Sequence, residues 1–225
     1  MLTPIHPRLY KGFGATTPKT PTRNAVMIVL GIYGSPRKGG NSDQLLDRAL
    51  KGVAASGAEV KKIYARHIKI SGCLECGGCD QTGICVQKDD MSQIYPLLEE
   101  SNVIILATPI FFYSPPAQIK AIIDRAQACW AKRFLTKPPE ARKRHDSGIG
   151  YLIAIGATKG KKLFDCTKLV AKYFFDALDM AYGGDLLIRG VEKKSDILKR
   201  SDALDAAYEL GKKAARAEQV GSTLL

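Results

Sequence analysis

The sequence predicts an α/β fold: a doubly wound, five-stranded parallel sheet with helices on both faces. Short apolar segments alternate with amphipathic helical patterns, and the first of them, residues 27–33 (MIVLGIY), is too continuously apolar for a half-exposed strand. The 225 residues, 45% hydrophobic and 25% charged, suffice for one domain with a large core. Right-handed crossovers make 2-1-3-4-5 the natural strand order. Ligands are therefore expected where strands one and three end and the winding reverses.

The other elements are expected in the following order. Apolar residues at helical spacing predict a helix from Asn41, and a second strand follows near residues 59–64. Asp89 or Asp90 is placed to cap the next helix, which leads into a third strand at residues 103–107. The remaining predicted elements are a long helix at about 116–133, a strand at 148–155, a helix at 163–178, a strand at 184–189 and a helix from 202 to about 216.

A cysteine-rich loop, residues 72–90, follows the second strand. Its four cysteines lie within thirteen residues and are Cys73, Cys76, Cys79 and Cys85. Thiolate sulfur suits iron-sulfur clusters and zinc, and the glycines of the loop permit tight turns around a metal. The strict three-residue steps favour a cluster held by all four thiolates, because zinc sites usually join two separated cysteine pairs. Structural zinc, and thiols that bind no metal, are the alternatives.

The first loop at the expected ligand edge, residues 34–42 (GSPRKGGNS), joins a buried strand to a helix N-terminus. Free helix amides and the helix dipole stabilise an anion there by about 0.3–2 kcal/mol. The loop matches neither a Walker sequence nor G-x-G-x-x-G, and its plain alternative is a strand–helix turn capped by Asn41. The residues expected to hold a phosphate are Ser35, Arg37, Gly40, Asn41 and Ser42.

Two further loops leave neighbouring strands at the same edge. Residues 108–114 (TPIFFYS) carry three aromatic side chains, which suit a flat ligand ring; packing in the core or at a subunit interface is the alternative for each. Residues 156–160 (GATKG) contain glycines that let a backbone edge approach the same ring, and a plain turn is equally consistent. The expected contacts with this ring are Thr108, Pro109, Ile110, Phe111, Phe112, Tyr113, Gly156, Ala157 and Gly160.

The formal net charge is +12, and residues 1–26 carry basic but no acidic side chains. This segment lacks hydrophobic periodicity, so an extended basic arm is expected, followed by a ligand-binding domain at 27–218 and a tail at 219–225. A mispredicted start, with Met27 as the initiator, and a targeting peptide are alternative explanations of the arm. No apolar run has the length of a membrane span, and the expected location is the cytoplasm.

Residues outside these loops carry weaker signals. A basic segment at 132–144, extended by Lys159, Lys161 and Lys162, would steer an acidic partner or the phosphates of a nicotinamide cofactor, or is a solvated surface. Nucleic acid is not expected as a partner, because no recognised binding fold is present. The histidine spacing indicates neither a triad nor a metal site. Cys129 and Cys166 are expected to be buried packing thiols.

Four segments together resemble the iron-sulfur flavoprotein branch of the NADPH-dependent FMN reductase, flavodoxin-like family, over roughly residue 27 to the final helix. They are GSPRKGGNS, the cysteine run with Asp89, Asp90 and Met91, TPIFFYSPPAQIKAIIDR, and GATKGKKLFDC. The resemblance implies a flavodoxin-like fold, a homodimer or tetramer, and a [4Fe-4S] cluster on the four cysteines. It also implies FMN, with its phosphate on Ser35, Arg37, Asn41 and Ser42 and its ring beside Pro109, Ile110, Phe111 and the Gly156 loop. Phe111 stands where relatives often place tyrosine, and the arm has no counterpart in the family.

Three functional hypotheses follow. The first is an FMN- and [4Fe-4S]-containing flavoprotein that transfers electrons between a one-electron carrier, such as an acidic ferredoxin-like protein, and a two-electron donor or acceptor. The second is an NAD(P)H-dependent FMN or quinone oxidoreductase without a cluster. The third is a zinc-stabilised binding module without redox activity. Metal content separates the first hypothesis from the others.

Overall fold

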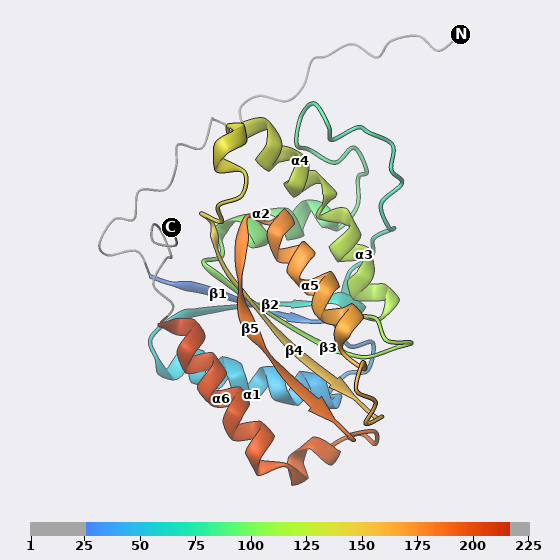
Figure 1. Cartoon of the computed structure of the whole chain (residues 1–225), viewed down its shortest axis with the longest axis vertical. Coiled ribbons are helices and arrows are strands. Elements are labelled where there is room, and N and C mark those ends of the chain that lie inside the picture. Colours follow the sequence, from blue (N-terminus) through green and yellow to red (C-terminus); the bar gives the residue numbers. More distant parts are fainter. Residues whose placement is uncertain (1–25, 217–225) are drawn as a thin grey trace.

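The computed structural model describes residues 26–216, which form a five-stranded parallel sheet with helices on both faces (Figure 1). The strand order is β2-β1-β3-β4-β5, so the predicted fold class is confirmed. The strands are β1 (Ile28–Tyr33), β2 (Glu59–Tyr64), β3 (Val103–Pro109), β4 (Gly148–Gly156) and β5 (Met180–Arg189). The helices are α1 (Asn41–Ala55), α2 (Met91–Glu100), α3 (Ala117–Arg125), α4 (Gln127–Thr136), α5 (Asp165–Ala177) and α6 (Ser201–Ala215). The predicted arm up to residue 25 and the predicted tail lie outside the described residues.

The sheet is buried on both faces because successive side chains of each strand enter two different apolar clusters. Leu30 and Ile32 of β1 pack in the cluster that contains residues of α2, α3 and α5, whereas Val29 and Tyr33 pack in the cluster of α1 and α6. Figure 1 shows the same division, with α1 and α6 on one side of the sheet and α2 to α5 on the other. Uniformly apolar strands are what a parallel sheet covered on both faces requires.

The prediction of a single long helix at about residues 116–133 is wrong. The structure divides this segment into two helices, α3 and α4, which meet at Ala126. The amide of Ala126 donates to the carbonyls of both Ile122 and Ile123, as at a helix end. The carbonyl of Arg125 accepts a hydrogen bond from the hydroxyl of Tyr95 on α2, at 2.9 Å. This tertiary contact satisfies a carbonyl that the break frees from the helix.

The fifth strand is longer than expected. It begins at Met180, whereas the sequence predicts a start at Gly184. Glycine has a low strand propensity, so the pair Gly183–Gly184 does not indicate a strand, and the sequence pattern places its start too late. The ladder with β4 also shifts register between Gly150 and Tyr151. A bulge of this kind interrupts the regular alternation of side chains on which strand prediction depends.

A search of residues 26–216 finds no helix with both the length and the apolarity needed to cross a membrane.

Candidate functional site

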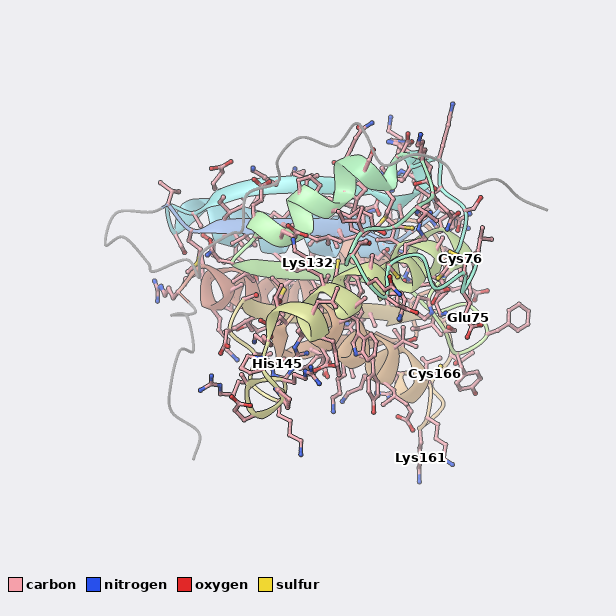
Figure 2. All side chains as sticks on the ribbon, turned by 90° about the horizontal axis from the view of Figure 1, so that it is seen from above. Glu75, Cys76, Lys132, His145, Lys161 and Cys166 are labelled. Atoms are coloured by element: carbon pink, nitrogen blue, oxygen red, sulfur yellow. The ribbon has the colours of Figure 1, made fainter. Side chains whose placement is uncertain are left out.

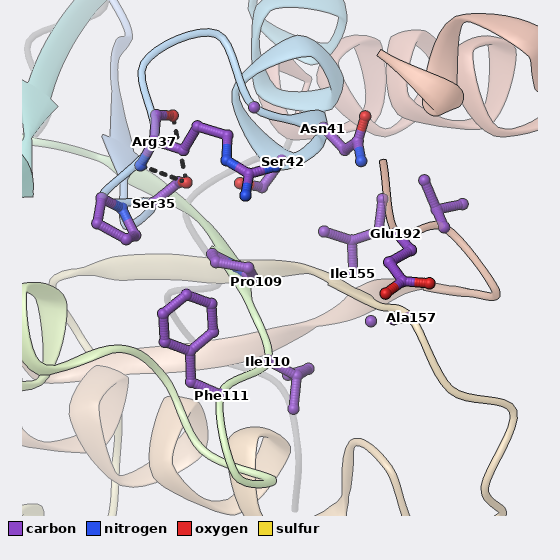
Figure 3. Close-up of a pocket in the computed structure, with 14 residues that line it drawn as sticks. Ser35, Arg37, Asn41, Ser42, Pro109, Ile110, Phe111, Ile155, Ala157 and Glu192 are labelled. Carbon is purple, nitrogen blue, oxygen red and sulfur yellow. Dashed lines mark hydrogen bonds between the residues drawn. The ribbon is translucent and has the colours of Figure 1, made fainter. Parts of the chain in front are cut away.

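A cavity of about 350 Å³ opens at the edge of the sheet where β1, β3 and β4 end. Its position lies at the reversal of strand order between β1 and β3, which is the usual ligand position in doubly wound folds. Figure 3 shows Arg37 and Ser42 on one side of the cavity and Ile110 and Phe111 on the opposite side. A polar wall therefore faces an apolar one.

The polar wall is formed by the β1–α1 loop, residues 34–40, and the first turn of α1. Arg37 donates its backbone N–H to Ser35 Oγ at 3.1 Å, which draws the loop into a turn (Figure 3). Gly39 has a left-handed backbone with φ 64°, a conformation that glycine adopts without strain. A Cβ on Gly40 would lie 3.2 Å from the carbonyl oxygen of Arg37, so the turn is tight. The free amides at the start of α1 stand at this wall, as in an anion site.

A buried ion pair supports this loop from behind. Asp43 of α1 and Arg66 lie 2.9 Å apart, and their side chains are only 4% and 10% exposed. Asp43 Oδ2 accepts the backbone N–H of Gly39 at 3.0 Å, and Arg66 Nη1 donates to the carbonyl of Ser35 at 3.3 Å. Burial raises the pKa of Asp43, and Arg66 opposes part of that shift. The pair therefore fixes both ends of the loop, and the buried carboxylate depends on Arg66 for its counter-charge.

The apolar wall continues into a tight turn, residues 111–114, which we call the aromatic turn. Phe111 and Ser114 exchange two backbone hydrogen bonds of 2.9 Å each. The two residues between them, Phe112 and Tyr113, have left-handed backbones with φ of 49° and 65°, which is uncommon for aromatic residues. Thr167 Oγ1 of α5 donates to the carbonyl of Tyr113 at 3.2 Å. A tertiary contact thus helps to hold an unfavourable backbone at the cavity edge.

The structure brings most of the predicted ligand contacts together around the cavity. The predicted residues that line it are Ser35, Arg37, Gly40, Asn41, Ser42, Pro109, Ile110, Phe111, Gly156 and Ala157. Thr108 is fully buried at the end of β3, Phe112 is fully exposed, and neither these two nor Tyr113 and Gly160 line the cavity.

Four further residues line the cavity and were not predicted: Pro36, Ile155, Val191 and Glu192. Val191 and Glu192 lie just beyond β5, after Gly190. The predicted parallel topology could have identified the two residues after β5, because the carboxyl ends of parallel strands meet at one edge of the sheet.

The cysteine loop, residues 72–90, joins the segment after β2 to α2 and packs on α4. Its four cysteines are free thiols: Cys73 and Cys76 are exposed, and Cys79 and Cys85 are partly buried. Figure 2 shows Cys76 at the outer edge of the molecule. Gly83 has a left-handed backbone with φ 68°, and a Cβ there would lie 2.7 Å from Cβ of Lys132 on α4. The loop therefore needs glycine at this contact, where backbone and helix touch.

The four cysteines of the loop are free thiols, but their side chains are not arranged around a common point. Among residues 26–216, no group of three or more His, Cys, Asp or Glu side chains is arranged to hold a metal ion. Burial raises the pKa of the Cys79 thiol, and the charges of Asp80, Cys85 and Cys73 raise it further. By its chemistry, a set of four free thiols in one loop fits an iron-sulfur cluster or zinc.

The structure also places the cysteines outside the loop and His145. The buried state expected for Cys166 is wrong, because it is exposed on α5. Cys129 on α4 is partly buried, and burial raises the pKa of its thiol to about 12. His145 pairs with Asp176 at 2.8 Å, which is a structural contact.

Much of the basic segment at 132–144 serves the fold rather than a free surface. Arg133 is buried and pairs with Asp176 and Asp179, and Lys137 pairs with Asp146 and Asp179. Lys159, Lys161 and Lys162 are exposed beside the cavity loop that follows β4.

Comparisons with known proteins agree with this arrangement. A family model described as NADPH-dependent FMN reductase matches residues 27–162. An iron-sulfur flavoprotein of Archaeoglobus fulgidus is 48% identical over 99 residues, which cover 44% of this chain and 45% of that protein. An iron-sulfur flavoprotein of Methanocaldococcus jannaschii is 29% identical over 199 residues, which cover 84% of this chain and 96% of that protein. The match thus spans about half the length of the first relative and nearly all of the second.

A solved structure shows the same fold. The NAD(P)H:quinone oxidoreductase from Methanothermobacter marburgensis superposes with a TM-score of 0.65 at 13% identity, over 86% of this chain and 100% of that one. At this identity the likeness concerns the fold alone.

Proposed function

The chain belongs to the NADPH-dependent FMN reductase family, and from this premise we propose that it is an FMN-dependent oxidoreductase whose cysteine loop holds a [4Fe-4S] cluster. The observation that carries the proposal is the cavity at the N-terminus of α1, with its polar wall facing an apolar one. When bound, FMN exchanges one or two electrons and the cluster exchanges one, so the pair would couple a one-electron carrier to a two-electron partner.

The polar wall supports binding of the FMN phosphate. Ser35, Arg37, Asn41 and Ser42 line the cavity beside the first turn of α1, where free amides and the helix dipole favour an anion. Pro109, Ile110 and Phe111 line the opposite side, and the backbone of Gly156 and Ala157 completes it, so a flat ring fits between apolar surfaces. Asp43 and Arg66 hold the β1–α1 loop in place for this contact.

The cysteine loop supports the second cofactor. Cys73, Cys76, Cys79 and Cys85 are free thiols in one loop, and they are the soft ligands that iron-sulfur clusters take. We propose a ferredoxin-like acidic protein as the one-electron partner, with NAD(P)H as an alternative donor. The exposed lysines at 159, 161 and 162 would steer either anion toward the cavity edge, and Figure 2 shows Lys161 projecting from the surface.

The experiment that tests this function is an ultraviolet-visible spectrum with assays of iron, acid-labile sulfide and zinc on protein purified without oxygen. We expect flavin bands over a broad shoulder, with about four irons and four sulfides per chain. Flavin bands without iron, even after anaerobic reconstitution, would overturn the cluster and leave the FMN assignment standing. Zinc without flavin would overturn both.

A second candidate function is an NAD(P)H-dependent FMN or quinone oxidoreductase without a cluster. The observation that favours it is the match of residues 27–162 to a family model described as NADPH-dependent FMN reductase. Rapid bleaching of the flavin by NADPH or NADH, in protein that takes up no iron, would support it.

The phosphate contacts give a further expected result. Replacing both Arg37 and Ser42 by alanine removes a charge and a hydroxyl from the polar wall, and hydrogen bonds to a charged group contribute about 1.5–3 kcal/mol each. The Kd for FMN, measured by flavin fluorescence quenching, should rise at least about tenfold. Riboflavin lacks the phosphate and is the matched control ligand, so its Kd should change much less. Equal losses for both ligands would contradict a phosphate contact at these residues.

A further inference from the structure

We propose that Arg125 is a positioning residue for the cysteine loop, one that clamps the two ends of the loop together and holds a positive charge beside it. The consequence for the cofactor rests on the proposed cluster, whereas the clamp is a feature of the chain itself. The argument starts from the contacts of one buried guanidinium.

Arg125 bridges the beginning and the end of the cysteine loop. Its Nη1 donates to the carbonyl of Ser71 at 3.1 Å and to Oδ2 of Asp89 at 2.6 Å, and its Nη2 donates to Oδ1 of Asp89 at 3.2 Å. Ser71 directly precedes the loop, and Asp89 is its penultimate residue. The planar fork of arginine suits a carboxylate in this bidentate way, and lysine does not reproduce it.

Two weaker contacts join the same two ends of the cysteine loop, residues 69–72 and 87–91, which together we call its stem. The backbone N–H of Lys69 donates to Oδ2 of Asp90 at 2.8 Å, and Nε2 of Gln87 donates to the carbonyl of Gly72 at 3.3 Å. Both lie at the surface, whereas Arg125 is only 1% exposed. Solvent competes with exposed hydrogen bonds, so the buried arginine is the contact that holds the stem most firmly.

The same side chain places a charge near the ligands. Nη1 of Arg125 donates to the carbonyl of Ser71, which lies two residues before Cys73. Burial lowers the pKa of Arg125, but the hydrogen bond to Asp89 opposes burial, and the pKa is raised overall. A guanidinium out of water acts more strongly on neighbouring charges than an exposed one. It favours the more reduced, more negative state of a cluster held by these thiolates.

The position of Arg125 in the fold connects the two candidate cofactor sites. The helix α3 begins at Ala117, just after the aromatic turn, and ends at Arg125, where α4 continues toward the contact of Lys132 with Gly83. Figure 1 shows α3 and α4 in succession along the side of the molecule that carries the cysteine loop. One helix thus links the cavity edge to the base of the loop, and the clamp fixes the loop relative to the cavity.

The electrostatic part is tested by redox titration of the cluster in two variants of opposite charge. Arg125→Met removes a positive charge and should lower the potential, with about a tenfold change in the oxidised-to-reduced ratio, which is about 59 mV for one electron. Asp89→Asn removes a negative charge and should shift the ratio in the opposite direction. Arg133→Met is the matched control: Arg133 is also buried and ion-paired, but its partners are Asp176 and Asp179. It should leave the ratio unchanged.

The clamp is tested without the cluster, by amide hydrogen exchange of the cluster-free protein. In Arg125→Lys, which keeps the charge and loses the fork, amides at both ends of the loop, residues 69–72 and 87–91, should exchange at least about tenfold faster. The Arg133→Met control should leave these amides at their original rates. If Arg125→Met does not fold, Arg125→Met combined with Asp89→Leu removes both charges and still tests the stem by exchange.

The outcomes separate this inference from the proposed function. Unchanged exchange at both ends of the loop in Arg125→Lys, or shifts of the same sign in Arg125→Met and Asp89→Asn, would overturn the inference while a cluster is present. Wild-type protein that takes up no iron would overturn the proposed cluster, and the exchange comparison would still decide whether Arg125 holds the stem.

Discussion

Replacing Cys85 by alanine is expected to lower the iron content clearly below the value of about four per chain proposed for the unchanged protein, because one iron of the proposed four-cysteine cluster would lose its thiolate. Cys85 lies in the cysteine loop, outside the cavity lining, so the FMN content should stay the same. Iron, acid-labile sulfide and flavin are measured on anaerobically reconstituted protein.

Cys166→Ala is the matched control for this change. Cys166 is also a free thiol, but it is exposed and lies on α5, outside the loop. Its replacement should leave iron, sulfide and flavin unchanged. An unchanged iron content in Cys85→Ala would show that Cys85 is not a ligand, and equal losses in both variants would point to general damage rather than to a lost ligand.

Replacing Arg66 by methionine is expected to destabilise the protein by about 3–5 kcal/mol, the usual cost of leaving one partner of a buried ion pair alone. Asp43 would stay buried without its counter-charge, and the β1–α1 loop would lose the contact to the carbonyl of Ser35. Urea unfolding at pH 8 measures the loss. Arg48→Met is the control, because Arg48 pairs with Asp205 at the surface, where the two side chains are 39% and 71% exposed. It should cost less than about 1 kcal/mol.

The pH dependence checks the cause of this effect. Burial raises the pKa of Asp43 above its ordinary value, and Arg66 holds part of that rise back. A carboxyl with a raised pKa contributes stability at low pH, and this contribution is lost as the pH rises through the folded-state pKa. Without Arg66 the pKa rises further, so the loss in Arg66→Met should be smaller at pH 5 than at pH 8. A loss no larger than that of Arg48→Met, or one independent of pH, would contradict the role of the pair.

The elements of the sheet could be predicted from the sequence because each has a local pattern. The continuously apolar β1 and β3 indicate a parallel sheet covered on both faces, and short connections with right-handed crossovers leave few strand orders to choose from. The break at Ala126 has no such pattern. The carbonyl that it frees accepts a hydrogen bond from Tyr95, which lies thirty residues from Arg125 in the chain, so this contact is visible only in the folded structure.

The candidate site divides in the same way. Residues next to strand ends, such as Arg37 and Phe111, could be predicted because the topology places strand ends at the ligand edge. The charged side chains that hold these loops in place could not be predicted from the sequence. Arg66 and Arg125 read as ordinary basic residues in the sequence, and their importance comes from burial and from partners distant along the chain.

The closed stem of the cysteine loop separates folding from metal loading. In a zinc finger, the metal supplies the folding energy, and the peptide without metal is unfolded. Here Arg125, Asp89 and Ser71 join the ends of the loop through groups that are not metal ligands, and the apolar core lies elsewhere. The loop is therefore expected to keep its closed ends without metal, and the proposed cluster would be added to a chain that is already folded. If the proposed cluster were lost by oxidation, the folded chain would remain and could be loaded again with iron and sulfide under reducing conditions.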